Sequence, residues 1–186
     1  MPATKIRSVA LLERAIGYTR AALALVDDSL LDEPTPCDRW DLRTLLEHMD
    51  EAFAAFTEAG ELGTVDLRPL ANRPEADRLV ESLRLRACSA LGGWTRHYGD
   101  ERVLIGTASL DAGALAAIGA LEIAVHGWDV GQACGADLPL PPKLAESLLD
   151  VAADIIGDAD RPIRFARPRE TDASDPGERL LAFLGR

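Results

Sequence analysis

A carboxylate and an imidazole lie four residues apart within an otherwise apolar segment of this chain. Between Ala112 and Ala133 the only formally charged residues are Glu122 and Asp129. At about 100° per residue, Glu122 and His126 share one narrow helical face that is otherwise apolar. Burying a carboxylate without a partner is costly, so Glu122 needs one. Neutral imidazole and carboxylate are both ligands for divalent metal ions, so the pair indicates a metal site.

A metal ion held by Glu122 and His126 needs a third ligand from a facing helix, and His48 is the best-placed residue. His48 lies beside an apolar helical stripe, next to the small residues Ala52 and Ala55, which leave room for a site. Three protein ligands leave a coordination position open for water or substrate, as in catalytic metal sites. Two alternatives stay open. In the first, Glu122 and His126 form a buried hydrogen bond without a metal ion. In the second, His48 lies on a helix surface or donates a hydrogen bond to a carbonyl in the core.

Other residues near these three have two interpretations each. Cys37, which precedes the helix of His48, is either a thiol close to a bound thiol cofactor or a small buried apolar residue. Trp40 either forms a wall of the site or packs in the core. Asp129 either pairs with Arg43 or accepts a hydrogen bond from His126 and orients it. His97 lies near the end of a predicted helix, where a contact with the helix C-terminus accounts for it.

The sequence favours a mainly all-α chain, because Ala and Leu are plentiful and aromatic residues make up only 5%. Apolar spacing predicts helices over residues 6–27, 42–59, 74–97, 112–134, 142–156 and 178–184. Asp38 or Asp41 caps the second helix, whereas Asp111 caps the fourth and Gly135 ends it. Residues 103–107 and 162–168 are expected to be short extended segments. We therefore expect one domain over residues 1–186, a four-helix bundle with short additional helices and minor strand segments.

Composition excludes several kinds of partner. The net charge of −11 and the pI of about 4.7 argue against nucleic acid and against an anionic membrane surface. The three cysteines form no CxxC pair, which argues against a disulfide framework or a cysteine zinc site and favours a reducing compartment. The longest apolar run, residues 112–121, is well short of the roughly 20 residues that a membrane span needs, and no signal peptide is evident. We expect a cytoplasmic protein.

Three separated segments resemble one known family. Residues 35–48, TPCDRWDLRTLLEH, are similar to the TPCxxWxVRxLLxH signature of the actinobacterial DinB-like metal-binding proteins, with Leu42 in place of valine. Residues 121–129, LEIAVHGWD, resemble the second motif of that family. Residues 179–186, RLLAFLGR, resemble the closing motif of a short branch. These proteins are related to the N-terminal domain of mycothiol-dependent maleylpyruvate isomerase.

The resemblance implies a DinB-like, up-down-down-up four-helix bundle that binds a divalent ion, zinc or nickel. Carried over position by position, the metal ligands are His48, Glu122 and His126. The resemblance also implies mycothiol as a thiol cofactor and a small electrophile as substrate. Because the chain ends at Arg186, we expect a short branch without the second, C-terminal domain. We assign no catalytic residue beyond the metal ligands.

These observations leave three functions open. The first is a metal-dependent transferase or isomerase, in which a thiolate of mycothiol attacks a small electrophile. A metal-activated water in place of the thiol would make the protein a hydrolase. The second function is a non-catalytic metal-binding module for sensing, storage or partner binding. The third is a helical scaffold whose acid–imidazole pair holds no metal. Either a monomer or a homodimer is expected.

Overall fold

The structure is a computed structural model that describes residues 3–37, 40–66, 78–96, 102–161 and 164–186. It is mainly helical, as predicted. The helices are α1 (Ala3–Leu23), η1 (Asp28–Leu30), α2 (Leu42–Leu62), α3 (Leu79–Arg96), α4 (Ala112–Ala133), α5 (Pro142–Ile155), η3 (Asp158–Asp160) and α6 (Pro176–Phe183). The chain divides into two compact units, Met1–Leu138 and Pro139–Arg186. The single domain expected over residues 1–186 stays a prediction.

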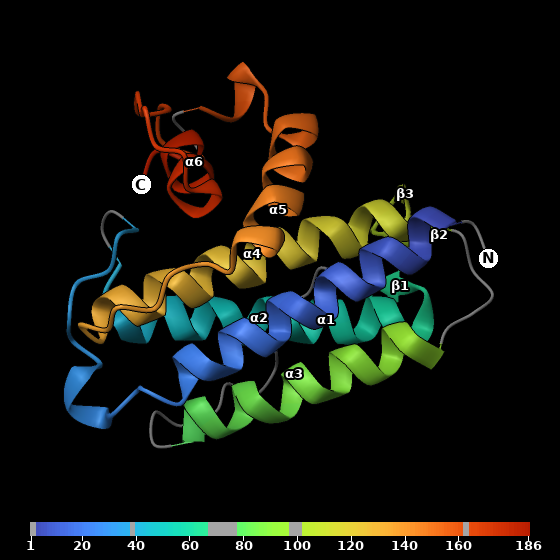
Figure 1. Cartoon of the computed structure of the whole chain (residues 1–186). Coiled ribbons are helices and arrows are strands. Elements are labelled where there is room, and N and C mark those ends of the chain that lie inside the picture. The colour runs from blue at the N-terminus through green and yellow to red at the C-terminus, as the bar shows by residue number, and fades with distance from the viewer. Residues whose placement is uncertain (1–2, 38–39, 67–77, 97–101, 162–163) are drawn as a thin grey trace. The chain divides into compact units, whose positions relative to one another are not determined.

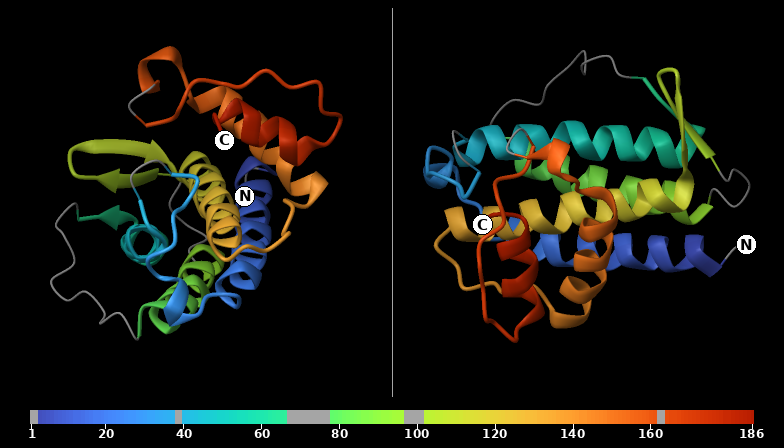
Figure 2. Two further views of the ribbon diagram at one scale, coloured as in Figure 1. Left: turned by 90° about the vertical axis from the view of Figure 1, so that its left-hand side faces the viewer. Right: turned by 90° about the horizontal axis from the view of Figure 1, so that it is seen from above.

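The first unit is a bundle of the four long helices α1 to α4. Helix α1 packs mainly against α4, and α2 packs mainly against α3. The colours along the ribbons show that α1 and α4 run in one direction and α2 and α3 in the other (Figure 1). Further views show these helices lying side by side (Figure 2). This is the expected up-down-down-up order. Its fully buried side chains include Leu12, Leu23, Leu42, Leu45, Leu46, Phe53 and Leu83.

Capping residues fix where the two site-bearing helices begin. The carboxylate of Asp41 accepts a hydrogen bond of 2.8 Å from the backbone N–H of Thr44 and caps α2. Asp111 caps α4 in the same way through Ala114, also at 2.8 Å. Both caps agree with the sequence analysis. The alternative cap, Asp38, lies outside the described residues.

Helix α4 is the core helix of the bundle. By length and composition alone it is apolar enough to cross a membrane, but 72% of its apolar window is buried within the protein. Nearly every residue from Ala120 to Val130 is buried. Glu122 is therefore held in place by a densely packed element. Gly135, which has φ of +67°, follows the end of the helix, as expected.

Several predicted boundaries differ from the observed ones. Helix α1 ends at Leu23 and not near residue 27, because the Asp27 side chain accepts from the Ser29 amide and starts the separate η1 turn. Helix α2 continues three residues past 59, to Leu62. The start of the third helix near residue 74, and its end at His97, lie outside the described residues. Helix α6 begins two residues early, at Pro176.

A three-stranded sheet accompanies the bundle. Strand β2 (Arg102–Ile105) pairs in parallel with β1 (Thr64–Val65) and antiparallel with β3 (Ala108–Asp111). The extended segment predicted at residues 103–107 is thus confirmed as far as Ile105. Gly106, with φ of +57°, makes the turn to β3.

The strand predicted over residues 162–168 is wrong for its described part, residues 164–168. A strand needs a neighbour to take up its amide groups. Here the amides of Arg164 and Phe165 both donate to the carbonyl of Asp160, and the nearby Arg169 amide donates to Ala182 of α6. These local bonds replace a ladder, so the segment stays irregular within the unit that also contains α5 and α6.

Close packing of α1 on α4 depends on Gly127. The buried Thr19 hydroxyl donates a hydrogen bond of 2.7 Å to the carbonyl of Ile123. A Cβ atom at position 127 would overlap the side chain of Thr19. At Gly131, one turn later, the nearest atom to an added Cβ is 3.6 Å away, which is an ordinary contact. Position 127 therefore sets how closely α4 approaches α1, one residue beyond His126.

We expect Gly127→Ala to lower the free energy of unfolding by about 1–3 kcal/mol, because the new methyl group overpacks the interface. Gly131→Ala is the matched control. It should raise stability by roughly 0.5–1 kcal/mol through helix propensity alone. Urea denaturation followed by circular dichroism measures both. A Gly127→Ala protein as stable as Gly131→Ala would contradict this account of the packing.

Candidate metal centre

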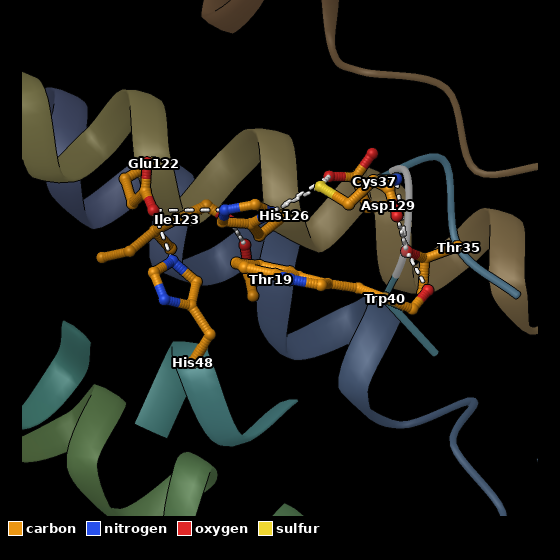
Figure 3. Close-up of polar contacts among 9 residues, drawn as sticks. All are labelled: Thr19, Thr35, Cys37, Trp40, His48, Glu122, Ile123, His126 and Asp129. Carbon is orange, nitrogen blue, oxygen red and sulfur yellow. Dashed lines mark hydrogen bonds and ion pairs between the residues drawn. The ribbon is translucent and has the colours of Figure 1, made fainter. Parts of the chain in front are cut away.

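Three side chains from two helices meet at a single oxygen atom. The Nε2 atom of His48, on α2, lies 2.8 Å from Oε1 of Glu122, on α4. The Nε2 atom of His126, one turn further along α4, lies 3.1 Å from the same oxygen. Figure 3 shows both imidazole rings directed at the Glu122 carboxylate. The structure thus brings together all three residues that the sequence analysis selected as metal ligands.

The spacing of these atoms fits a metal ion. The ligand atoms of His48, Glu122 and His126 all lie within 4.8 Å of one another. Ligands bound to a tetrahedral zinc ion at about 2.0–2.1 Å are about 3.3 Å apart. The observed distances of 2.8 and 3.1 Å are a few tenths shorter, so small side-chain movements would open the cluster around an ion.

His126 lies between two carboxylates. Its Nδ1 atom is 3.0 Å from Oδ2 of Asp129, and its Nε2 atom is 3.1 Å from Oε1 of Glu122. A neutral imidazole has only one N–H, so it can donate to only one of them. Without a metal ion, and with both carboxylates ionised, the ring must carry two protons to satisfy both. A cation between Nε2 and Glu122 would satisfy the same geometry with a neutral ring.

The protonation behaviour follows from these contacts. Burial by itself lowers the pKa of His126, but hydrogen bonds to Asp129, Cys37 and Glu122 outweigh it and raise that pKa well above its ordinary value. Burial by itself raises the pKa of Glu122. Hydrogen bonds from His126 and His48 outweigh it and hold that pKa well below its ordinary value. The cluster therefore stabilises an anionic Glu122 facing positive charge.

Asp129 and Cys37 lie on the other side of the His126 ring. Asp129 is fully buried, and its Oδ2 atom also accepts a hydrogen bond of 3.4 Å from the Cys37 thiol. Of the two partners expected for Asp129, the observed one is His126, whereas Arg43 lies 4.0 Å from Asp32. The thiol contact was not anticipated. The contact of Asp129 with His126 is the second of its two predicted roles, whereas no spacing pointed to the contact of Cys37 with Asp129.

Trp40 covers the two histidines. Its ring centroid is 4.9 Å from that of His48 and 6.1 Å from that of His126. The hydroxyl of Thr35 donates to the carbonyl of Trp40 at 2.9 Å and accepts from the amide of Cys37 at 3.2 Å. These bonds hold Cys37 and Trp40 close to Thr35, just before α2. Trp40 thus forms a wall of the site, which is the first of its two predicted roles.

The cluster is open on one side. The side chains of His48 and Glu122 are 35% and 34% exposed, whereas that of His126 is 10% exposed. A pocket of about 10 Å³ adjoins them, enough for about one water-sized group. Its lining comprises Met49, Ala52, Phe53, Glu122, Ile123 and His126. A ligand would therefore meet one small apolar recess beside the polar cluster.

Comparison with known proteins identifies the family. The sequence profile of the mycothiol maleylpyruvate isomerase N-terminal domain matches residues 12–131, which include His48, Glu122 and His126. This chain belongs to the mycothiol maleylpyruvate isomerase N-terminal domain family. The resemblance found in the sequence motifs is thereby confirmed.

The relatives of this chain include two uncharacterized proteins from two strains of Mycobacterium tuberculosis. Each is 26% identical over 182 residues, which cover 94% of this chain and 94% of the relative. Among solved structures, a mycothiol-dependent maleylpyruvate isomerase aligns with a TM-score of 0.61 and 18% identity, covering 82% of this chain and 68% of that one. A histidine-to-alanine mutant of such an isomerase gives 0.58 and 17%. These alignments confirm the predicted DinB-like fold.

The shifted pKa values predict how stability depends on pH in chelator-treated protein. The pKa of His126 is raised, so its contribution is complete below its ordinary value of 6.5 and is lost as the pH rises towards its folded pKa. The pKa of Glu122 is lowered, so its contribution is complete above 4.5 and is lost as the pH falls. The two together should give the highest unfolding free energy between these values.

Urea denaturation at a series of pH values, with a metal chelator present, measures this profile. His126→Gln provides the control, because glutamine does not titrate. We expect the decline of stability above pH 6.5 to be weaker in that variant. An identical decline in both proteins would contradict the assignment to His126.

Proposed function

We propose that this protein is a divalent-metal-dependent enzyme that uses a thiol cofactor. It would transfer that thiol to a small electrophile or use it to isomerise the electrophile. The main support is that Nε2 of His48 and Nε2 of His126 meet at Oε1 of Glu122, next to a small pocket. Zinc is the ion we favour, with nickel as the alternative. Mycothiol is the thiol we favour, because the matched family and the solved neighbours are named for it.

In this proposal the metal ligands are His48, Glu122 and His126. Two nitrogens and one carboxylate oxygen suit zinc or nickel and leave at least one coordination position for an external ligand. Asp129 would hold the His126 proton on Nδ1, which directs the Nε2 lone pair at the ion. Trp40 would limit movement of both rings from its side.

A bound divalent ion would lower the pKa of a thiol at the open position, so that the thiol reacts as a thiolate at neutral pH. The chain's own residues prepare that position. Glu122 supplies the one negative charge among the ligands, and its lowered pKa keeps it ionised. Met49, Phe53 and Ile123 form an apolar wall beside Glu122 and His126, which would limit the access of bulk water to a thiol bound there. His48 and Glu122 are partly exposed, and the electrophile would approach the site from this exposed side.

A metal-dependent hydrolase is the second candidate. One observation favours it, namely that the pocket beside Glu122 and His126 holds about one water-sized group. In that case the residues would position a water molecule and not a thiol. A non-catalytic metal-binding module would use the same three ligands, and the experiments below separate it from both enzymes.

The remaining expectations are part of the same proposal. We place the chain in the cytoplasm, as one domain over residues 1–186 that is a monomer or homodimer. Its net charge of −11 supports a small-molecule role without nucleic acid or an anionic membrane as partner.

Metal analysis tests the centre. Protein from cells grown with added zinc or nickel should contain about one ion per chain, and His48→Ala should lose it. Asp129→Asn should keep the site but bind zinc about 10–100-fold more weakly, as measured by competition with a chelating dye. Arg43→Ala, a change at a half-buried residue on the same helix that pairs with Asp32, is the control that should retain the metal. Equal metal content in His48→Ala and Arg43→Ala would rule out this ligand set.

A thermal-shift experiment with mycothiol tests the cofactor. We expect the thiol to raise the melting temperature of metal-loaded protein and to leave chelator-treated protein unchanged, because the metal provides its binding position. Turnover of small electrophiles should then require both components. A metal-loaded protein indifferent to the thiol would exclude the transferase and isomerase. Thiol-independent turnover would instead support the hydrolase.

A further inference from the structure

We propose a second metal site, selective for soft cations, formed by Cys37, Asp129 and the Nδ1 atom of His126. It lies on the opposite side of the His126 ring from Glu122, as the close-up shows (Figure 3). It uses different atoms from the first centre, so its existence does not depend on the proposed function.

The three ligand atoms already have nearly the spacing of a metal site. The Cys37 sulfur lies 4.0 Å from Nδ1 of His126 and 3.4 Å from Oδ2 of Asp129, and the last two atoms are 3.0 Å apart. Around a tetrahedral ion with metal–sulfur bonds of about 2.3 Å and metal–nitrogen bonds of about 2.0 Å, sulfur is about 3.5 Å from its neighbouring ligands. Shifts of about half an ångström would therefore be sufficient.

The chemistry of the set selects the kind of ion. Thiolate and imidazole favour soft or borderline cations such as Cd²⁺, Zn²⁺ and Cu⁺, whereas Mg²⁺ and Ca²⁺ require oxygen ligands. A thiolate and the buried carboxylate of Asp129 would together balance a divalent charge. Cys37 is half-buried, whereas His126 and Asp129 are buried, so an ion would enter the site from the side of Cys37. On binding, the thiol proton leaves to solvent.

The two sites share one imidazole, which couples them. An ion on Nδ1 leaves the ring proton on Nε2, where Oε1 of Glu122 accepts it at 3.1 Å. An ion on Nε2 leaves the proton on Nδ1, where Asp129 accepts it at 3.0 Å. A neutral ring cannot bind an ion through both nitrogens. Occupation of the second site therefore removes a ligand from the first, and this consequence does rest on the proposed function.

Cadmium titration tests the second site directly. The other two thiols are first removed with Cys88→Ser and Cys134→Ser, and Cd²⁺ binding is followed by the ultraviolet charge-transfer absorption of cadmium thiolate. We expect the band to saturate at about one equivalent and to persist when His48→Ala is added. Adding Cys37→Ser should abolish it, and His126→Gln should weaken binding at least about tenfold. A band unaffected by His126→Gln, or absent from the starting protein, would overturn the proposal.

A second measurement uses the unaltered protein and so does not depend on any variant folding. Cd²⁺ should protect Cys37 from alkylation by iodoacetamide, at concentrations that leave the exposed Cys88 reactive, as read by peptide mass spectrometry. Equal alkylation of Cys37 with and without Cd²⁺ would contradict the proposed site. The thiol would then only donate a hydrogen bond to Asp129.

Zinc release tests the coupling. In zinc-loaded protein that has Cys88→Ser and Cys134→Ser, zinc should appear in solution as the cadmium thiolate band grows. Growth of the band with all zinc retained would show that the sites are independent. Failure of the first centre would appear differently, as a lack of stoichiometric zinc before any cadmium is added.

Discussion

The imidazoles of His48 and His126 both hydrogen-bond to the same oxygen of Glu122, and the rest of the structure depends on this interaction. It requires a carboxylate on the most deeply buried helix of the bundle and a histidine from α2 within 2.8 Å of it. The Glu122 side chain is about one third exposed, so positive charge or a metal ion facing it stabilises its carboxylate where burial would otherwise disfavour it. The caps at Asp41 and Asp111 fix where α2 and α4 begin, and Gly127 sets how closely α4 approaches α1.

His126 connects this contact to the residues on the other side of its own ring. Each ring nitrogen faces a carboxylate, so the ring either carries two protons or exchanges one of them for a cation. Proton binding and metal binding are thus alternatives at the same atoms. The buried Asp129 decides which nitrogen faces Glu122, and the Cys37 thiol donates to that same aspartate. A change at Cys37 therefore reaches the cluster through Asp129 and the ring.

Local patterns made much of this predictable. Helical periodicity placed Glu122 and His126 on one face, and small neighbours selected His48, because both signals depend only on spacing along a helix. The caps at Asp41 and Asp111 are equally local. The contact of Cys37 was beyond such reasoning, since its partners lie 89 and 92 residues away on a different helix. The strand predicted at residues 162–168 was wrong for a related reason, because pairing depends on which neighbour the segment meets.

The position of Cys37 also bears on whether the proposed first centre would be structural or catalytic. Structural zinc sites have four protein ligands, and a nearby thiol would be the natural fourth. Here the sulfur approaches Nδ1 of His126, whereas the first cluster uses Nε2, so the thiol lies on the wrong side of the ring to complete it. The side chains of His48 and Glu122 instead remain about one third exposed, so solvent could reach an ion that they held. An ion held there would have an external ligand, which is what an enzyme requires and a purely structural site avoids.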